Sequence, residues 1–280
     1  MKVAVMTDST AYIPKDMRNA YGIHMVPLSV IFGDEIYQEE VDISTEEFYL
    51  KIKDVKELPT TSQPAIGLIT EKLEELSKEY DAVVSVHLSS GISGTYQAMV
   101  SAGDMVEGIK VYAFDSEISC MAQGFYALEA AEMAKENRSP EEILDRLNEM
   151  KETMHGYFMV DDLTNLHRGG RLNGAQALVG SLLQVKPVLH FVDKVIVPFE
   201  KIRTRKKALN RILGMLEDDA KEDKVAKVVF VHANDEQAAL ELKEGFNEKY
   251  PNTEALISYF GPVIGTHVGE GAIGVCWYYK

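Results

Sequence analysis

The sequence is poor in cysteine and has no long apolar run. Cys120 and Cys276 are the two cysteines among 280 residues, too few for a disulfide framework or a cysteine-based metal cluster. We expect both to be buried as small apolar side chains in a reducing compartment. No apolar stretch approaches the roughly 20 residues of a membrane-spanning helix. Asp8 interrupts the apolar start, unlike a secretion signal. The sequence therefore predicts a cytoplasmic protein without a transmembrane segment.

Basic residues are also scarce. The chain has 29 Lys and Arg against 44 Asp and Glu, a formal net charge of -15. Such a chain is repelled by nucleic acid and by anionic membranes unless a local basic patch intervenes. Hydrophobic residues make up 46% of the sequence and charged residues 26%, as in ordinary globular proteins. We therefore expect a folded protein that does not bind nucleic acid.

The first half of the chain alternates predicted strands and helices. This alternation favours a mainly parallel sheet covered on both faces. At 139–150, Ser139 and Glu142 form a capping-box pattern with Pro140 at the first helical position. The predicted strands are 2–6, 22–33 with an interruption near Pro27, 81–88 and 109–115; the predicted helices begin at Pro64 and cover 93–106, 122–136 and 139–150.

The second half mixes shorter strands with helices, and a Gly/Ala/Leu-rich segment covers 173–183. We predict strands at 156–160, 186–192, 194–199, 227–233, 254–260 and 271–279, with helices at 203–220 and from Asp235. The sequence thus predicts an α/β protein of two closely packed domains, 1–155 and 156–280, the second with a mixed sheet. No linker composition marks the boundary.

Ser93 lies in the stretch LSSGISGTYQAM, where a strand is predicted to meet a helix. It could attack a substrate or hold an anion. The nucleophile elbow G-x-S-x-G fails by one position, because Thr95 stands where the second glycine belongs. Five histidines follow in the chain, and their spacing selects none as a base. A serine hydrolase or esterase that uses Ser93 is kept as the alternative function.

Asp8, Ser9 and Thr10 follow the first predicted strand. Aspartyl phosphatases of the haloacid dehalogenase type have D-x-D-x-[TV] at this place, and Thr10 stands where the second acid belongs. The three residues could cap a helix or brace a loop; we expect them to brace the mouth of a site, where parallel strands end. A phosphate loop of the type G-x-x-x-x-G-K-[ST] is absent from the sequence, which argues against a nucleotide site.

Two loops share one design, with hydroxyl residues leading into a predicted helix. In the first loop they are Thr60, Thr61 and Ser62, and in the second Ser89, Ser90 and Ser93. Unpaired amides at a helix N-terminus attract anions, although simple helix capping would explain either loop alone. A third element is His267, in a glycine-rich loop that lets backbone approach a ligand closely.

A local excess of basic residues stands out on this acidic chain. It comprises Arg168, Arg171, Lys201, Arg203, Arg205, Lys206 and Lys207. Cations are unfavourable at the start of a helix, so a phosphorylated ligand or an acidic partner is a reason for their presence. A solvated helix start is the simpler explanation.

Together these motifs resemble the DegV family, the fatty-acid-binding proteins that serve bacterial fatty acid kinase. The resemblance spans the chain: VMTDSTAYIP, PTTSQP, SSGISGTYQ, FDSEISCMAQG, DLTNLHRGGRL, LLQVKPVLHF, KIRTRKKAL and GPVIGTHVGEGAIG occur in the family's order. Asn165 and Arg168 depart from the family pattern D-L-x-Y-L-x-K-G-G-R, and Cys120 and Ala122 depart from the family's D-S segment.

The resemblance implies that one long-chain fatty acid binds between the two domains. Its carboxylate is expected at Thr61 and Ser93, with His267 nearby and Ser62, Gly94 and Thr95 completing the ligand-binding set. Asp8, Ser9, Thr10, Asp115 and Ser116 are expected to support the mouth of the site; Arg171, Arg203 and Arg205 are expected to contact the kinase or the phosphoryl group.

The same resemblance implies a protein that is not itself an enzyme, with no catalytic residue, metal or cofactor besides the bound fatty acid. A separate kinase subunit would phosphorylate the acid. The chain would then carry the acyl phosphate toward phospholipid synthesis, with transient contact to an acyltransferase at the membrane. A stand-alone small-molecule kinase, suggested by similarity to the substrate domain of dihydroxyacetone kinase, is a third hypothesis.

Overall fold

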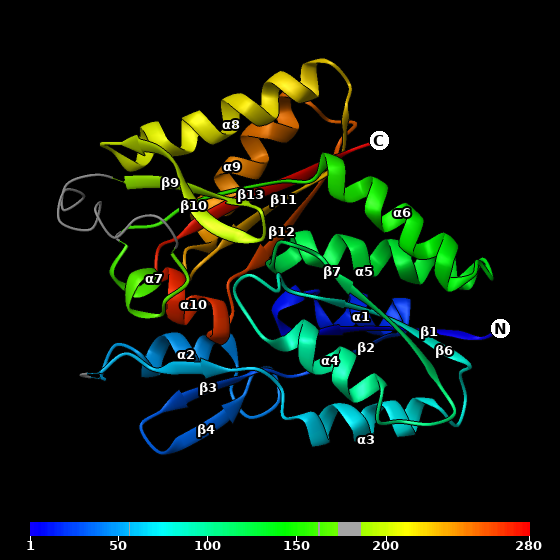
Figure 1. Cartoon of the computed structure of the whole chain (residues 1–280). Helices are drawn as coiled ribbons and strands as arrows, with labels where there is room; N and C mark the ends of the chain where they lie inside the picture. Colours follow the sequence, from blue (N-terminus) through cyan, green and yellow to red (C-terminus); the bar gives the residue numbers. More distant parts are fainter. Residues whose placement is uncertain (56, 162, 173–185) are drawn as a thin grey trace.

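The computed structural model describes residues 1–55, 57–161, 163–172 and 186–280. Its first large sheet is parallel, with strand order β2-β1-β6-β7. The strands are β1 (Val3–Asp8), β2 (Ile23–Val26), β6 (Ala82–His87) and β7 (Lys110–Asp115) (Figure 1). Every residue of β6 is buried, as expected of a central parallel strand covered on both faces. The predicted parallel sheet is confirmed.

Helices cover both faces of this sheet. On one face, α3 (Ile66–Leu76) and α4 (Thr95–Gly103) pack on Met6 and Val83. On the other face lies α5 (Cys120–Lys135), followed by α6 (Pro140–Thr153). The capping box of α6 is present, because Ser139 and Glu142 each accept the other's backbone N–H through their side chains. The remaining elements of this part are the 3-10 turn η1 (Ser9–Ala11) and α1 (Lys15–Tyr21).

The predicted strand at 22–33 is interrupted near Pro27, as expected, but its two pieces belong to different sheets. β2 joins the parallel sheet, whereas β3 (Ser29–Phe32) is the centre of a small antiparallel sheet with order β4-β3-β5. Proline donates no backbone hydrogen bond, which suits the point where the chain changes sheets. The partners of β3 are β4 (Glu35–Gln38) and β5 (Thr60–Ser62), with α2 (Thr45–Lys51) between them in the chain.

The second large sheet is mixed, as predicted, with strand order β10-β9-β8-β13-β11-β12. Among its described pairs, β11–β12 is parallel and the other four are antiparallel. Its elements are β8 (His155–Met159), α7 (Thr164–Arg168), β9 (Lys186–Val192), β10 (Val195–Ile202), α8 (Arg205–Lys221), β11 (Val225–His232), α9 (Glu236–Lys249), β12 (Glu254–Tyr259), α10 (Pro262–Val268) and β13 (Ile273–Tyr279). The segment predicted at 173–183 lies outside the described residues.

Helix α5 lies between the two large sheets (Figure 1). It contacts β1 and β6 on one side and β11, β12 and β13 on the other. Its buried alanines let both sheets approach closely, and one apolar core joins Val5 and Val84 of the first sheet to Val229 and Val231 of the second. Each large sheet and the helices packed on it form one layer, and the two layers share one hydrophobic core. In the described residues, no helix combines the length and apolarity needed to cross a membrane.

Candidate functional site

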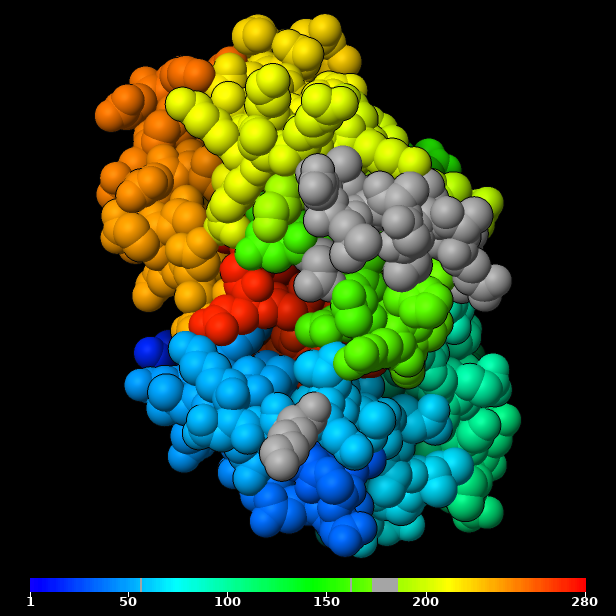
Figure 2. Space-filling view, turned by 90° about the vertical axis from the view of Figure 1, so that its left-hand side faces the viewer, coloured from blue at the N-terminus to red at the C-terminus, as the bar shows by residue number. Residues whose placement is uncertain are grey.

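A cavity of about 290 Å³ lies between the first sheet's loops and the second sheet. Apolar side chains from both halves of the chain form most of its wall. Figure 2 shows the C-terminal residues in red between the blue-to-cyan N-terminal part and the yellow part above. The apolar lining includes Leu28, Leu88, Ile92, Ile118, Cys120, Phe158, Leu166, Phe191, Ile196, Val231, Phe260, Val263, Ile264, Val268 and Cys276. A cavity of this kind suits a ligand with a large apolar part.

Polar side chains line the cavity as well. Thr61 and His267 meet there, with 2.9 Å between Thr61 Oγ1 and His267 Nε2. Ser62, Gln63, Ser93, Gly94 and Arg171 also line the cavity. The structure thus places the predicted ligand-binding residues Thr61, Ser62, Ser93, Gly94 and His267 on one cavity, although Thr61 and His267 are 206 positions apart in the chain.

Thr61 is positioned by the small sheet, and not by a helix start as the sequence suggested. It is the middle residue of β5 and pairs with Val30 of β3, while α3 begins only at Ile66. Pairing with β3 fixes the backbone position of Thr61 at the cavity.

His267 belongs to the last turn of helix α10, so the predicted loop conformation is wrong. Pro262 at the first helical position and a segment buried at every residue favour a short packed helix here. Burial, with a smaller contribution from the charge of Arg171, lowers the pKa of His267 to about 4. The ring is therefore neutral at pH 7. Its Nδ1 is buried and has no hydrogen-bond partner among the described residues.

Ser93 lies just before α4 and bonds locally. Its Oγ is 2.9 Å from Thr95 Oγ1 and accepts the Thr95 amide at 3.3 Å. Within the described part of the chain these are its hydrogen-bond partners, and neither is a base that could activate a nucleophile. Thr95 itself is buried and is not part of the cavity wall. Gly94 packs against the side chain of Gln63, and a Cβ there would lie 2.0 Å from Gln63 Oε1, so that this side chain would have to move.

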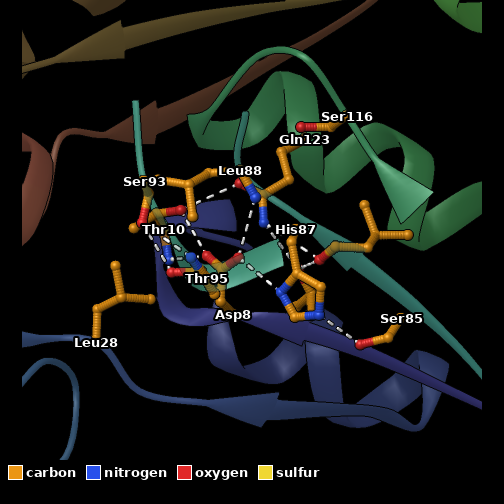
Figure 3. Close-up of polar contacts among 12 residues, drawn as sticks. Asp8, Thr10, Leu28, Ser85, His87, Leu88, Ser93, Thr95, Ser116 and Gln123 are labelled. Carbon is orange, nitrogen blue, oxygen red and sulfur yellow. Dashed lines mark hydrogen bonds and ion pairs between the residues drawn. The ribbon is translucent and has the colours of Figure 1, made fainter. Parts of the chain in front are cut away.

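Asp8 and Thr10 lie beneath residues 88–94, which we call the Ser93 loop (Figure 3). Both are buried and neither lines the cavity. Asp8 Oδ2 accepts the Leu88 amide and contacts His87 Nδ1, both at 3.0 Å. Its Oδ1 accepts from the Thr10 amide and hydroxyl. Burial would raise the pKa of Asp8, but the hydrogen bond and charge of His87, with Thr10 and the Leu88 amide, hold that pKa below its ordinary value. Asp8 therefore anchors the loop from below.

Ser9 connects this region to a second buried carboxylate. Ser9 Oγ donates to Glu39 Oε2 at 2.6 Å and accepts the Leu28 amide at 3.1 Å. Glu39 Oε1 accepts from Tyr12 Oη and from the Val263 amide, both at 2.8 Å. Glu39 thereby ties the first part of the chain to the start of α10, the helix that carries His267. Nothing in the sequence distinguishes Glu39 from its exposed acidic neighbours, and sequence reasoning missed it.

Asp115 and Ser116 support the Ser93 loop from its side. Asp115 accepts the amide and hydroxyl of Ser90, at 3.0 and 2.5 Å, and pairs with Lys194 at 2.9 Å. Ser116 Oγ donates to the Ile118 carbonyl. Neither lines the cavity. Because Lys194 comes from the β9–β10 turn, Asp115 joins the first sheet to the second.

The three predicted arginines fall in different places. Arg171 lines the cavity and donates through Nε to the Ile92 carbonyl at 3.2 Å. Arg205 donates to the Gly271 carbonyl and to Asp235, both at 2.5 Å, so it serves as a brace within the second layer. Arg203 is exposed. Arg203 and Arg205 are not part of the cavity wall.

Known proteins match this chain over its full length. The family model described as "Uncharacterised protein, DegV family" matches residues 2–280. The chain belongs to the DegV family. Protein DegV of Bacillus subtilis (strain 168) is 58% identical over 281 residues and both chains are covered completely.

Solved structures of DegV proteins have the same fold. The crystal structure of DegV from Bacillus subtilis, described as a fatty acid binding protein, matches with a TM-score of 0.95 at 58% identity, covering 100% of each chain. A DegV family protein from Thermus thermophilus, described by its fatty acid binding, matches with a TM-score of 0.92 at 33% identity, again over 100% of each chain. The arrangement of two α/β layers is thus that of the DegV family.

Proposed function

We propose that this DegV protein binds one long-chain fatty acid in the cavity between its two layers. The observation that carries the proposal is a cavity with an apolar wall from both halves of the chain and the Thr61–His267 pair on its surface. The relatives from Bacillus subtilis and Thermus thermophilus, described as binding fatty acids, support it.

The acyl chain is expected to provide most of the binding free energy. Each buried CH₂ group contributes roughly 0.8 kcal/mol, so a long chain outweighs a few hydrogen bonds worth about 1 kcal/mol each. Thr61 and Ser93 would hold the carboxylate, with the Thr61 hydroxyl oriented by His267. Hydroxyls suit this role because they leave no basic side chain unpaired inside the protein when the ligand departs.

We further infer that the protein presents the carboxylate to a separate ATP-dependent kinase in the cytoplasm, and carries the acyl phosphate toward phospholipid synthesis. Among the described residues, Ser93 Oγ bonds to Thr95 and not to a base, which fits a group that holds a ligand better than one that attacks it. This role assigns Thr61, Ser93 and His267 to positioning, and leaves bond making to the partner.

The first test is extraction of the purified protein with organic solvent, followed by mass spectrometry. We expect about one long-chain fatty acid per chain. An empty extract, together with ester hydrolysis that disappears in Ser93→Ala, would contradict the proposal and favour a hydrolase. ATP consumption by the protein alone would contradict the proposal that a separate kinase phosphorylates the bound acid.

A second test distinguishes the positioning of the carboxylate from the overall affinity for the fatty acid. Thr61→Val and Ser93→Ala should lower the yield of acyl phosphate with an added kinase about tenfold or more, and lower fatty acid affinity less, because each removes a hydrogen bond and no apolar contact. Thr70→Val is the matched control, since its hydroxyl forms an exposed hydrogen bond to the Gly67 carbonyl on α3. Equal losses of yield and affinity, or no loss of either, would contradict the assigned roles.

A further inference from the structure

A second cavity of about 330 Å³ adjoins the Thr61–His267 pair from outside. Thr61, Arg171 and His267 line both cavities and so form the partition between them. We call this second space the outer chamber. Its other lining residues are Glu57, Leu58, Pro59, Thr60, Asn165, Arg168, Gly169 and Thr266. In Figure 2 the green segment that includes α7 lies directly against the cyan segment that leads into β5.

Arg171 is an unusual cation within this partition. Its guanidinium donates to the carbonyls of Ile92 and Gly169. Within the described part of the chain it has no carboxylate partner. Burial lowers its pKa. Since the described residues offer this half-buried arginine carbonyls and no carboxylate, an anionic ligand beside it would be stabilised by its charge.

Arg168 adds a second cation to the outer chamber. It is exposed at the end of α7, and no ion pair with another described residue is recorded for it. Among the described residues that line the chamber, Glu57 is the one carboxylate. Two arginines against one glutamate make the chamber locally basic, on a chain with a net charge of -15.

Uncharged polar groups complete the chamber. Thr60 and Asn165 bring a hydroxyl and a side-chain amide, and the buried His267 Nδ1 lacks a partner among the described residues. Two guanidinium groups with neutral donors around them match a phosphate better than a carboxylate, since phosphate offers more oxygens and more charge. The apolar cavity and the basic chamber meet at the residues that would hold a fatty acid carboxylate.

We propose that the outer chamber binds the phosphate of a phosphorylated lipid whose chain lies in the inner cavity, and that Arg168 is a specificity residue for that phosphate. The proposal rests on the proposed function and names a place for the product's head group. It assigns the phosphate to Arg168 and Arg171, whereas the sequence had pointed to Arg203 and Arg205 beside Arg171. The Arg205 guanidinium already donates hydrogen bonds to Asp235 and to the Gly271 carbonyl.

The test compares two ligands of equal chain length, hexadecanoic acid and hexadecyl phosphate, in the wild type, Arg168→Ala and the control Arg138→Ala. Arg138 is an exposed arginine that pairs with Glu142 at the start of α6. We expect Arg168→Ala to weaken hexadecyl phosphate binding about tenfold and leave hexadecanoate affinity within twofold, because charged hydrogen bonds of arginine to phosphate are lost selectively. The control should change neither affinity.

Inorganic phosphate distinguishes the source of the anion. If the chamber takes phosphate, millimolar inorganic phosphate should weaken hexadecyl phosphate binding to the wild type and have less effect on Arg168→Ala. Equal loss of both lipids in Arg168→Ala, or no loss of either, would overturn the proposal. A wild type that binds neither lipid would instead contradict the proposed function, so the two failures can be told apart.

Discussion

Asp8 and Glu39 are both fully buried carboxylates next to the site, yet their pKa values shift in opposite directions. Burial would raise the pKa of each. At Asp8 the hydrogen bond and charge of His87, with Thr10 and the Leu88 amide, outweigh burial and lower the pKa. At Glu39 burial prevails over hydrogen bonds from Ser9, the Val263 amide and Tyr12, and raises the pKa to about 7.

The difference shows which interactions stabilise each of the two buried carboxylates. At Glu39 the neutral donors do not outweigh burial, whereas at Asp8 the hydrogen bond and charge of His87 add to those of the neutral donors and do. Asp8 supports the Ser93 loop within the first sheet. Glu39 supports α10, and therefore His267, across 224 positions of sequence. The loop that carries Ser93 is thus held by the Asp8–His87 pair. Helix α10 is held by the carboxyl group of Glu39, whose pKa is about 7.

Removing the Asp–His pair should have the largest effect. Asp8→Ala leaves His87 and the Leu88 amide without their partner inside the protein. We expect the free energy of unfolding to fall by about 3–5 kcal/mol, measured by urea denaturation at pH 7. Asp218→Ala, at an exposed position on α8, should change it by less than about 0.5 kcal/mol. A loss at Asp8 no larger than at Asp218 would show that the pair does not stabilise the fold.

Glu39→Gln should change how the free energy of unfolding depends on pH. The folded-state pKa of Glu39, about 7, lies above its ordinary value of 4.5, so its contribution to stability is complete below pH 4.5 and is lost as pH rises through 7. The loss amounts to up to about 3 kcal/mol. Relative to the wild type, Glu39→Gln should therefore gain stability between pH 5 and pH 8.

Urea denaturation across that pH range measures this difference. Glu74→Gln, at an exposed position of α3, is the matched control and should follow the wild type at every pH. A stability difference between Glu39→Gln and the wild type that does not vary with pH would mean that folding does not raise the pKa of Glu39.

Much of this arrangement could be predicted from the sequence because local patterns encode it. The capping box of α6 and the buried run of β6 are set by neighbouring residues, and both were predicted correctly. The hydroxyls of Thr61 and Ser93 stood out because serine and threonine gathered in two loops. Both residues line one cavity, and their role in holding a carboxylate stays a prediction.

Other features depend on contacts between distant segments, which local patterns do not encode. The burial of Glu39 arises only when Ser9, Tyr12 and α10 meet. The conformation of α10 was mispredicted because its glycines suggested a loop, whereas packing on all sides selects a helix. Arg203 and Arg205 looked equivalent to Arg171 in composition, and only the fold shows that Arg205 pairs with Asp235.

The smallest expected effect concerns His267, which lies on the helix that Glu39 supports. Its folded-state pKa of about 4 is below the ordinary 6.5 because of burial, so the stability it contributes is present above pH 6.5 and is lost progressively as pH falls from 6.5 through 4. NMR of the imidazole ring should therefore show a neutral side chain throughout pH 5.5–8, the interval in which Glu39 titrates. In Thr61→Val the ring should stay neutral over the same interval, because burial and not the hydrogen bond lowers the pKa. A midpoint near 6.5 would mean that the His267 ring is solvated in the folded protein, which would contradict its burial in the partition between the two cavities.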